Sequence, residues 1–335
     1  MPVMLKSTPG ASIHPKFKDF LLTDIQYKTV HGIPIPATIL LPTHIAHKPG
    51  RYPVAIRWHG GGFGTGHRLY GDWYASFILE LYKKHNAIGI TVDYRLAPEA
   101  NGMEILQDLK DFYTWLFAPA SNLAAALPEG VEPDLTSVLV SGESAGGWLA
   151  IQSALTQPAG RFAAVIAQYA MIDLRDGHYT QHYHKQIFGC PQYDAAEFHA
   201  YVASLKGDEV VSSRSLPSDE AAQQRTITMF QQGLYARFFG RERELYPLEM
   251  LDGVAYETPI WVLHGERDSA VPIEGSKKLV EKLKGGKASV HTSFVEGEEH
   301  GFDLLGANGQ QAGLETTTWV KEGVEFIERF WPKRQ

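Results

Sequence analysis

Five apolar segments, alternating with helical patterns, most strongly constrain how this 335-residue chain can fold. Each is a near-continuous run of Val, Ile, Ala and other apolar residues, which is typical of strands buried on both faces of a parallel sheet. Because helical patterns alternate with them, the order predicts a doubly wound sheet with helices on both faces. The predicted strands are residues 52–60, 87–94, 136–142, 162–170 and 258–265. The predicted helices are residues 72–85, 102–117, 145–157, 274–284 and 315–331.

Two further segments depart from this alternation. Residues 24–30 and 34–42 have strand-like sequences with no helix between them, so they predict an antiparallel hairpin on the sheet edge. Residues 173–253 separate two predicted strands by roughly eighty residues, far more than the ~2–6 of an ordinary connection between strand and helix. Because this segment is rich in polar and aromatic residues and contains helical stretches, we predict a helical cap with its own structure.

The composition excludes several classes of protein. With 44% hydrophobic and 21% charged residues, the chain has the composition of a soluble globular protein. A formal net charge of -7 offers no positive surface for a phosphate backbone, so we expect no nucleic-acid partner. No segment approaches the ~20 apolar residues of a membrane span, and a single cysteine, Cys190, excludes an intramolecular disulfide. We therefore expect a cytoplasmic protein, and the sequence leaves open whether it forms a homodimer.

A G-x-S-x-G sequence, residues 142–146, follows one of the predicted strands and precedes a predicted helix. In that context the small residues allow a tight turn that raises the Ser144 hydroxyl above the sheet as a nucleophile. The alternative is a plain structural turn. A serine is activated only by a positioned imidazole, which in turn needs a carboxylate to fix its tautomer. The sequence must therefore also supply a histidine and an acid.

Candidates for both groups follow Ser144 in the order expected of a strand-turn-helix nucleophile. Asp268 lies three residues beyond the predicted strand 258–265, and His300 follows the next strand-like run. Each residue taken alone could be an ordinary loop residue. Glu266 remains a rival to Asp268 as the acid, because it lies in the same loop.

Three consecutive glycines, residues 60–62, at the end of the predicted strand 52–60 can supply the donors that an oxyanion needs. Backbone amides of Gly61 and Gly62, with no side chains in the way, can point at a developing negative charge, together with the amide of Ala145. Phosphate binding is the alternative use of a glycine-rich loop, but no lysine-threonine pair follows here. We expect His59 to order this loop rather than to transfer protons.

Five short motifs occur in a fixed order along the chain: HGGGF at 59–63, DYRLAPEA at 93–100, GESAGG at 142–147, RDSAVP at 267–272 and EHGF at 299–302. Together they resemble those of the hormone-sensitive-lipase-like esterases of the α/β-hydrolase superfamily, with fungal members the most similar. The resemblance covers about residues 50–305.

Two positions depart from the family pattern. Glu143 stands where many relatives have Asp or Thr, and we expect its side chain to point away from the nucleophile. Asp268 is followed by Ser-Ala rather than Pro-Leu.

The resemblance implies an α/β-hydrolase fold, with a mostly parallel, doubly wound, eight-stranded sheet and a helical cap. It implies a catalytic triad of Ser144, Asp268 and His300, with no cofactor, and an oxyanion hole from the amides already named. The implied divisions are 1–50 as N-terminal cap segment and edge hairpin, 51–172 and 254–335 as catalytic domain, and 173–253 as cap. Aromatic residues that could line the substrate pocket are Phe63, Tyr70, Trp73 and Tyr183. The histidines of the cap, His178, His182 and His184, are not spaced as metal ligands, so no metal is expected.

The function expected from these residues is hydrolysis of small to medium, fairly apolar carboxylic esters by a serine hydrolase. An alternative is an enzyme that acts on a lactone or ester of a polyketide-like metabolite, either by hydrolysis or by acyl transfer to an alcohol instead of water. A second alternative, from another class, is a non-catalytic receptor for a small ligand on the same fold. Such a receptor dispenses with the catalytic histidine, so His300 argues against it.

Overall fold

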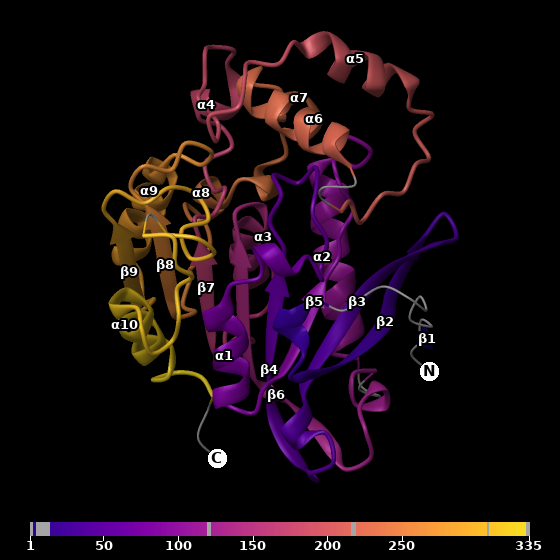
Figure 1. Cartoon of the computed structure of the whole chain (residues 1–335), viewed down its shortest axis with the longest axis vertical. Helices are drawn as coiled ribbons and strands as arrows, with labels where there is room; N and C mark the ends of the chain where they lie inside the picture. Colours follow the sequence, from indigo (N-terminus) through magenta and orange to yellow (C-terminus); the bar gives the residue numbers. More distant parts are fainter. Residues whose placement is uncertain (1–2, 5–13, 119–121, 216–218, 307, 333–335) are drawn as a thin grey trace.

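The computed structural model describes residues 3–4, 14–118, 122–215, 219–306 and 308–332. Helices cover both faces of one large sheet, and a second group of helices lies over one end of the sheet (Figure 1). The predicted doubly wound α/β architecture is thereby confirmed.

The described residues form nine strands in one sheet, in the spatial order β1-β2-β3-β5-β4-β6-β7-β8-β9. Strands β4 to β9 run parallel to one another, whereas β1, β2 and β3 pair antiparallel with their neighbours. The bounds are β1 Val3–Met4, β2 Phe20–Val30, β3 Ile33–Pro42, β4 Gly50–Trp58, β5 Ile88–Val92, β6 Val131–Glu143, β7 Ala164–Gln168, β8 Ile260–Gly265 and β9 Val290–Val295.

The eight expected strands are β2 to β9, and β2 with β3 forms the predicted edge hairpin. Within the hairpin Phe20 pairs with Pro42 and Val30 pairs with Ile33. The ninth strand, β1, adds two residues to the outer edge, where Val3 pairs with Gln26. A two-residue strand is too short to carry a hydrophobic period, so the sequence pattern could not predict it.

Five helices of the body match the five predicted from the sequence, with shorter bounds at several ends. Their bounds are α1 Ser76–Lys84, α2 Gly102–Leu116, α3 Ala145–Thr156, α9 Ile273–Lys284 and α10 Thr318–Ile327. The first begins four residues later than predicted because Gly71–Trp73 forms a separate 3-10 turn. The second begins with a capping box, in which Asn101 and Glu104 each accept a hydrogen bond from the other's backbone amide.

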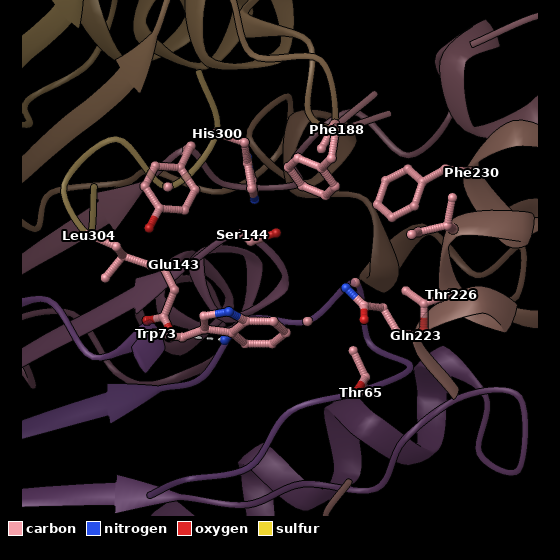
Figure 2. Close-up of a pocket in the computed structure, with 17 residues that line it drawn as sticks. Thr65, Trp73, Glu143, Ser144, Phe188, Gln223, Thr226, Phe230, His300 and Leu304 are labelled. Carbon is pink, nitrogen blue, oxygen red and sulfur yellow. Dashed lines mark hydrogen bonds between the residues drawn. The ribbon is translucent and has the colours of Figure 1, made fainter. Parts of the chain in front are cut away.

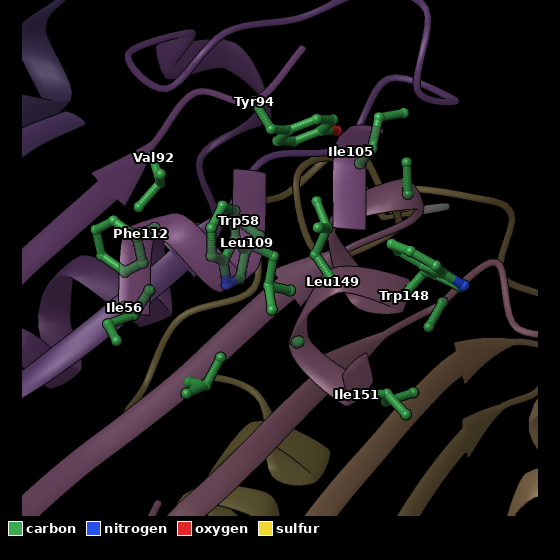
Figure 3. Close-up of a cluster of buried hydrophobic side chains, with 14 of the residues drawn as sticks. Ile56, Trp58, Val92, Tyr94, Ile105, Leu109, Phe112, Trp148, Leu149 and Ile151 are labelled. Carbon is green, nitrogen blue, oxygen red and sulfur yellow. The ribbon is translucent and has the colours of Figure 1, made fainter. Parts of the chain in front are cut away.

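Side chains of β4 alternate between two hydrophobic clusters, because successive residues of a strand face opposite sides of a sheet. Val54, Ile56 and Trp58 belong to the cluster that α2, α3 and α9 cover, whereas Ala55 belongs to the cluster under α1 and α10. Figure 3 shows part of the first cluster, where Trp58 meets the Phe112 ring of α2 at a centroid distance of 5.3 Å. The body helices are thus fixed on both faces of the same strands.

The segment between β7 and β8, residues 173–253, is called the cap from here on. It lies over the carboxyl ends of the parallel strands and contains short helices (Figure 1). Their bounds are α4 Gly177–Thr180, α5 Ala195–Ser204, α6 Glu220–Gln231, α7 Tyr235–Phe238 and α8 Pro247–Met250. Within the predicted N-terminal cap segment, residues 1–2 and 5–13 lie outside the described part of the chain.

Packing of α10 on β8 generates a first prediction. A Cβ at Gly323 would overlap the buried indole ring of Trp261. An alanine in a helix interior normally stabilises a protein by about 1 kcal/mol relative to glycine. Here we expect Gly323→Ala to destabilise by about 1–3 kcal/mol, because overpacking outweighs helix propensity. Urea unfolding measures the difference.

Gly285→Ala is the matched control. The nearest atom to a Cβ at Gly285, the carbonyl oxygen of Lys282, lies 3.7 Å away, and φ is -76°. Its unfolding free energy should stay within about 0.5 kcal/mol of the parent. A Gly323→Ala protein as stable as the parent would contradict this account of the helix-sheet contact.

Candidate active site

Ser144 lies on a strained turn between β6, which ends at Glu143, and α3, which begins at Ala145. Its φ of 56° and ψ of -118° fall in a region that non-glycine residues rarely adopt. The turn is held by its neighbours: Ser144 N donates to the Gln168 carbonyl at 2.8 Å, and Met171 N donates to the Ser144 carbonyl at 3.0 Å. These hydrogen bonds to the neighbouring backbone therefore hold Ser144 in its strained conformation.

Gly142 and Gly146, two residues before and after Ser144, lie so close to other backbone atoms that no side chain fits there. A Cβ at Gly142 would overlap the carbonyl of Gly146, and a Cβ at Gly146 would overlap the carbonyl of Trp58 at the end of β4. Only glycine lets the start of α3 come so near to β4. The turn that carries Ser144 is consequently adjacent to the glycine-rich loop that follows β4.

Asp268 and His300 are brought together from the loops after β8 and β9. Asp268 Oδ2 lies 2.6 Å from His300 Nδ1. The same carboxylate accepts hydrogen bonds from the backbone amides of Ala270 at 2.9 Å and Val271 at 2.7 Å, and its Oδ2 is 3.1 Å from His264 Nε2. A carboxylate with these partners has a fixed position and orientation.

Glu266, the rival acid, is exposed, whereas the Asp268 side chain is fully buried. Burial alone would favour the neutral forms of Asp268 and His300, but their mutual attraction outweighs it. The pKa of Asp268 is therefore well below its usual value, and the pKa of His300 is raised. His264 was not identified from the sequence, because its role depends on a loop that folds back onto β8.

The loop after β4, residues 59–66, is called the oxyanion loop here, after the role that the sequence predicts for its amides. Gly61 and Gly62 have positive φ values of 106° and 56°, which favour glycine. His59 Nδ1 lies 2.8 Å from the Gly60 carbonyl, and since a carbonyl only accepts, this nitrogen carries the proton. Burial holds the pKa of His59 well below its usual value, so the ring stays neutral. His59 thus orders the loop, as expected.

A buried ion pair joins the oxyanion loop to the Ser144 turn. Glu143 Oε1 accepts from the Gly60 amide at 2.9 Å and forms an ion pair with Arg57, whose Nε donates to Oε2 at 3.2 Å. Arg57 also donates to the carbonyls of Arg68 at 3.2 Å and Trp73 at 3.1 Å. Burial raises the pKa of Glu143 to about 7, although Arg57 and the Gly60 amide favour its charged form.

A cavity of about 300 Å³ lies between the body and the cap and contains Ser144 and His300. Figure 2 shows these two side chains pointing toward one another, with Trp73 on one side of the cavity and Phe188 and Phe230 on another. The lining is mainly apolar. It comprises Gly60, Gly61, Gly62, Thr65, Trp73, Glu143, Ser144, Tyr169, Phe188, Gln223, Thr226, Ile227, Phe230, Ala270, His300, Gly301 and Leu304.

Of the four aromatic residues expected to line the pocket, Trp73 does so. Among the described residues, the other three are not part of the lining. Phe63 is fully buried and packs on Trp148 and Phe239 in the core. Tyr70 packs on Trp73 at a centroid distance of 4.9 Å, and Tyr183 is 46% exposed on the cap surface.

Several lining residues were not identified from the sequence. One face of α6 supplies Gln223, Thr226, Ile227 and Phe230, which recur at the helical spacing of three or four residues. That spacing indicates residues on one face of the helix, but it does not indicate which cavity the face lines.

Tyr169 was also missed. Its ring lies against the His300 imidazole at a centroid distance of 4.5 Å, and its hydroxyl donates to Asp303 at 2.8 Å. Burial raises the pKa of Asp303, which also accepts from the side-chain amide of Gln168 at 2.6 Å. The Tyr169 ring, held by Asp303, therefore limits the movement of the His300 imidazole.

The fold and the site together define a class of protein. Residues 55–304 match the family described as alpha/beta hydrolase fold, and the chain belongs to this family. A probable carboxylesterase of Phoma sp. is 30% identical over 332 residues, covering 96% of this chain and 99% of that protein. The methylphloroacetophenone synthase of Cladonia uncialis is 25% identical over 92% of this chain, but only 13% of that much longer protein is covered. A solved structure from work on two fungal esterases of Rhizomucor miehei has a TM-score of 0.59 at 17% identity, covering 93% of this chain and 83% of that one.

Two further observations concern other classes of site. In the described part of the chain, no helix has both the length and the hydropathy to cross a bilayer. Nor do three or more His, Cys, Asp or Glu side chains gather as metal ligands among residues 14–118, 122–215, 219–306 and 308–332. His178 instead lies 2.9 Å from the Ala270 carbonyl, so it connects the cap to the Asp268 loop.

The Asp268–His300 geometry predicts a measurable change in titration. In Asp268→Asn the attraction that raises the pKa of His300 is lost while burial remains, so this pKa should fall. Chemical shifts of the His300 imidazole against pH, followed by NMR, would measure the change. Glu266→Gln is the control and should leave the titration in place. A fall in the control with none in Asp268→Asn would assign the acid to Glu266.

Proposed function

We propose that this protein is a serine carboxylester hydrolase that cleaves small to medium apolar esters through an acyl-enzyme. The observation that carries the proposal is the strained Ser144 turn, beside His300, in a largely apolar cavity. The Asp268–His300 distance of 2.6 Å supports the triad of Ser144, Asp268 and His300. The similarity to a probable carboxylesterase over nearly the whole chain supports the same reaction.

In this mechanism Ser144 Oγ attacks the ester carbonyl while His300 takes its proton. Asp268 holds His300 through Nδ1 and stabilises the imidazolium that forms. The amides of Gly61, Gly62 and Ala145 stabilise the oxyanion of the tetrahedral intermediate. His300 returns the proton to the leaving alcohol. Water then attacks the acyl-enzyme while His300 takes its proton, and the acid leaves as the acyl–Oγ bond breaks and His300 returns the proton to Ser144 Oγ.

The size and lining of the cavity support the substrate class. A volume of about 300 Å³ suits an ester of modest size and leaves little room for long chains. Among the described residues that line it, the side chains of Trp73, Phe188, Ile227, Phe230 and Leu304 offer apolar surface to the acyl or alcohol part. The partner is then a small-molecule ester or lactone.

One comparison favours a second candidate within the same chemistry. The matched synthase of Cladonia uncialis is, by its name, a methylphloroacetophenone synthase, and five further matches are named non-reducing polyketide synthases. The second candidate substrate is therefore an aromatic polyketide ester or lactone, whose acyl group is transferred either to water or to an alcohol. Product analysis by mass spectrometry, with and without an added alcohol, separates hydrolysis from transfer.

The proposal divides the chain as the motifs suggest. Residues 51–172 and 254–335 carry the chemistry, while the cap, residues 173–253, encloses the substrate. The helices of the cap and its contribution of Gln223 and Phe230 to the cavity support this division. A receptor without catalysis is disfavoured because His300 and Asp268 are in contact.

Labelling with a fluorophosphonate tests the proposal. Only a hydroxyl activated by a base and an oxyanion hole reacts with it at neutral pH, so we expect one label, on Ser144. Intact mass and peptide mapping identify the site. Ser144→Ala should abolish labelling and hydrolysis of p-nitrophenyl butyrate while leaving the thermal unfolding midpoint close to the parent. The assignment of Ser144 would be wrong if the Ser144→Ala variant were still labelled at another residue, or if it hydrolysed the ester as fast as the parent.

A further inference from the structure

Three alternate carbonyl groups of the oxyanion loop accept hydrogen bonds from the cap. The Tyr235 hydroxyl donates to the Gly62 carbonyl at 2.9 Å, and Arg214 Nη1 donates to the Gly64 carbonyl at 3.0 Å. Arg214 also forms a β-bridge with Gly66, in which its amide donates to the Gly66 carbonyl at 2.9 Å and its carbonyl accepts from the Gly66 amide at 3.0 Å. The cap is therefore bonded along the length of this loop.

Tyr235 acts at the glycine that most needs support. Gly62 has a φ of 56° and no side chain, so its backbone can adopt many φ and ψ values. The orientation of the peptide planes on either side of it therefore depends on hydrogen bonds from other residues. The plane before Gly62 is held because the Gly61 carbonyl accepts from the amides of Gly64 and Thr65, both at 3.0 Å. The plane after it is held by the hydroxyl of Tyr235. The plane before Gly62 carries the Gly62 amide, and the plane after it carries the Gly62 carbonyl, so the two supports together hold the backbone on both sides of this glycine.

The cap also fills the space around Gly62. A Cβ there would lie 2.7 Å from Thr226 Cγ2 and 3.0 Å from both the Phe230 ring and the Tyr235 hydroxyl oxygen. Tyr235 is 1% exposed, and burial raises the pKa of its hydroxyl well above the usual value. The hydroxyl consequently remains a donor throughout the working range of an esterase.

Arg214 is itself fixed. Its side chain is buried and forms an ion pair with Glu99, and its Nη1 donates to the Ala97 carbonyl at 3.3 Å as well as to Gly64. Tyr201, also in the cap, donates to the same Glu99 carboxylate. A charged group with all these partners holds one position, and removing it would leave the buried Glu99 carboxylate without its cation.

From these contacts we propose that Tyr235 and Arg214 of the cap are positioning residues for the oxyanion hole. The inference rests on the proposed esterase function and extends it: the cap encloses the substrate and also holds the loop that stabilises the transition state. The effect of losing either residue should then appear in kcat, even with an ester too small to contact much of the cap.

Tyr235→Phe, assayed with p-nitrophenyl acetate, tests the proposal. Direct removal of one oxyanion donor lowers kcat by about 10²–10³, so loosening a donor should cost less, about tenfold, with little change in KM. Affinity for a trifluoromethyl ketone, which adds to the serine as an oxyanion, should fall by a similar factor. The matched control is Tyr246→Phe, because the Tyr246 hydroxyl also donates to a glycine carbonyl, that of Gly240, but within the cap. It should behave like the parent.

Arg214→Gln provides a second variant, which retains the backbone bridge to Gly66 and loses the guanidinium. Its kcat should also fall, measured per active site titrated with fluorophosphonate so that misfolded protein is not counted. Unchanged kcat in Tyr235→Phe, or an equal loss in Tyr246→Phe, would overturn the proposal. So would a loss that disappears when rates are expressed per titrated site. A parent protein that hydrolyses no ester would instead refute the proposed function itself.

Discussion

The approach of the Gly146 backbone to the end of β4 is the constraint on which the rest of the site depends. No side chain fits between Gly146 and the Trp58 carbonyl, so the turn carrying Ser144 is pressed against the start of the oxyanion loop. Ser144 and the glycines of the oxyanion loop, the proposed nucleophile and oxyanion donors, are then neighbours because two strands are neighbours. The sheet register that pairs Trp58 with Gly142 sets this relation before any catalytic side chain is considered.

The buried ion pair between Arg57 and Glu143 contributes more to the geometry of the site than to the stability of the fold. Replacing a buried ion pair with apolar groups is often neutral or stabilising, so its contribution to stability is no explanation for its presence. What it does here is connect three segments, because Arg57 bonds to the carbonyls of Arg68 and Trp73 while Glu143 bonds to Gly60. Local order around the nucleophile is the benefit that the contacts themselves suggest.

Much of the fold followed from the sequence because parallel strands and body helices carry local patterns. The candidates Ser144, Asp268 and His300 could also be identified, since each follows its own strand, but only the structure shows that the Asp268 side chain is buried whereas Glu266 is exposed. Other features depend on contacts between distant segments. Phe63 was expected in the pocket and lies in the core, whereas Phe188 lines the pocket.

The hydrogen bonds from the cap to Gly62, Gly64 and Gly66 bear on how relatives of this protein can diverge. A cap that only covered the cavity could be exchanged between family members as an independent module. Here the exchanged segment would also remove Tyr235 and Arg214, and with them the partners of the loop. On the proposed role of Tyr235 and Arg214, selection for a new substrate through this cap would act on specificity and turnover together, which favours gradual substitution on α6 over replacement of the whole segment.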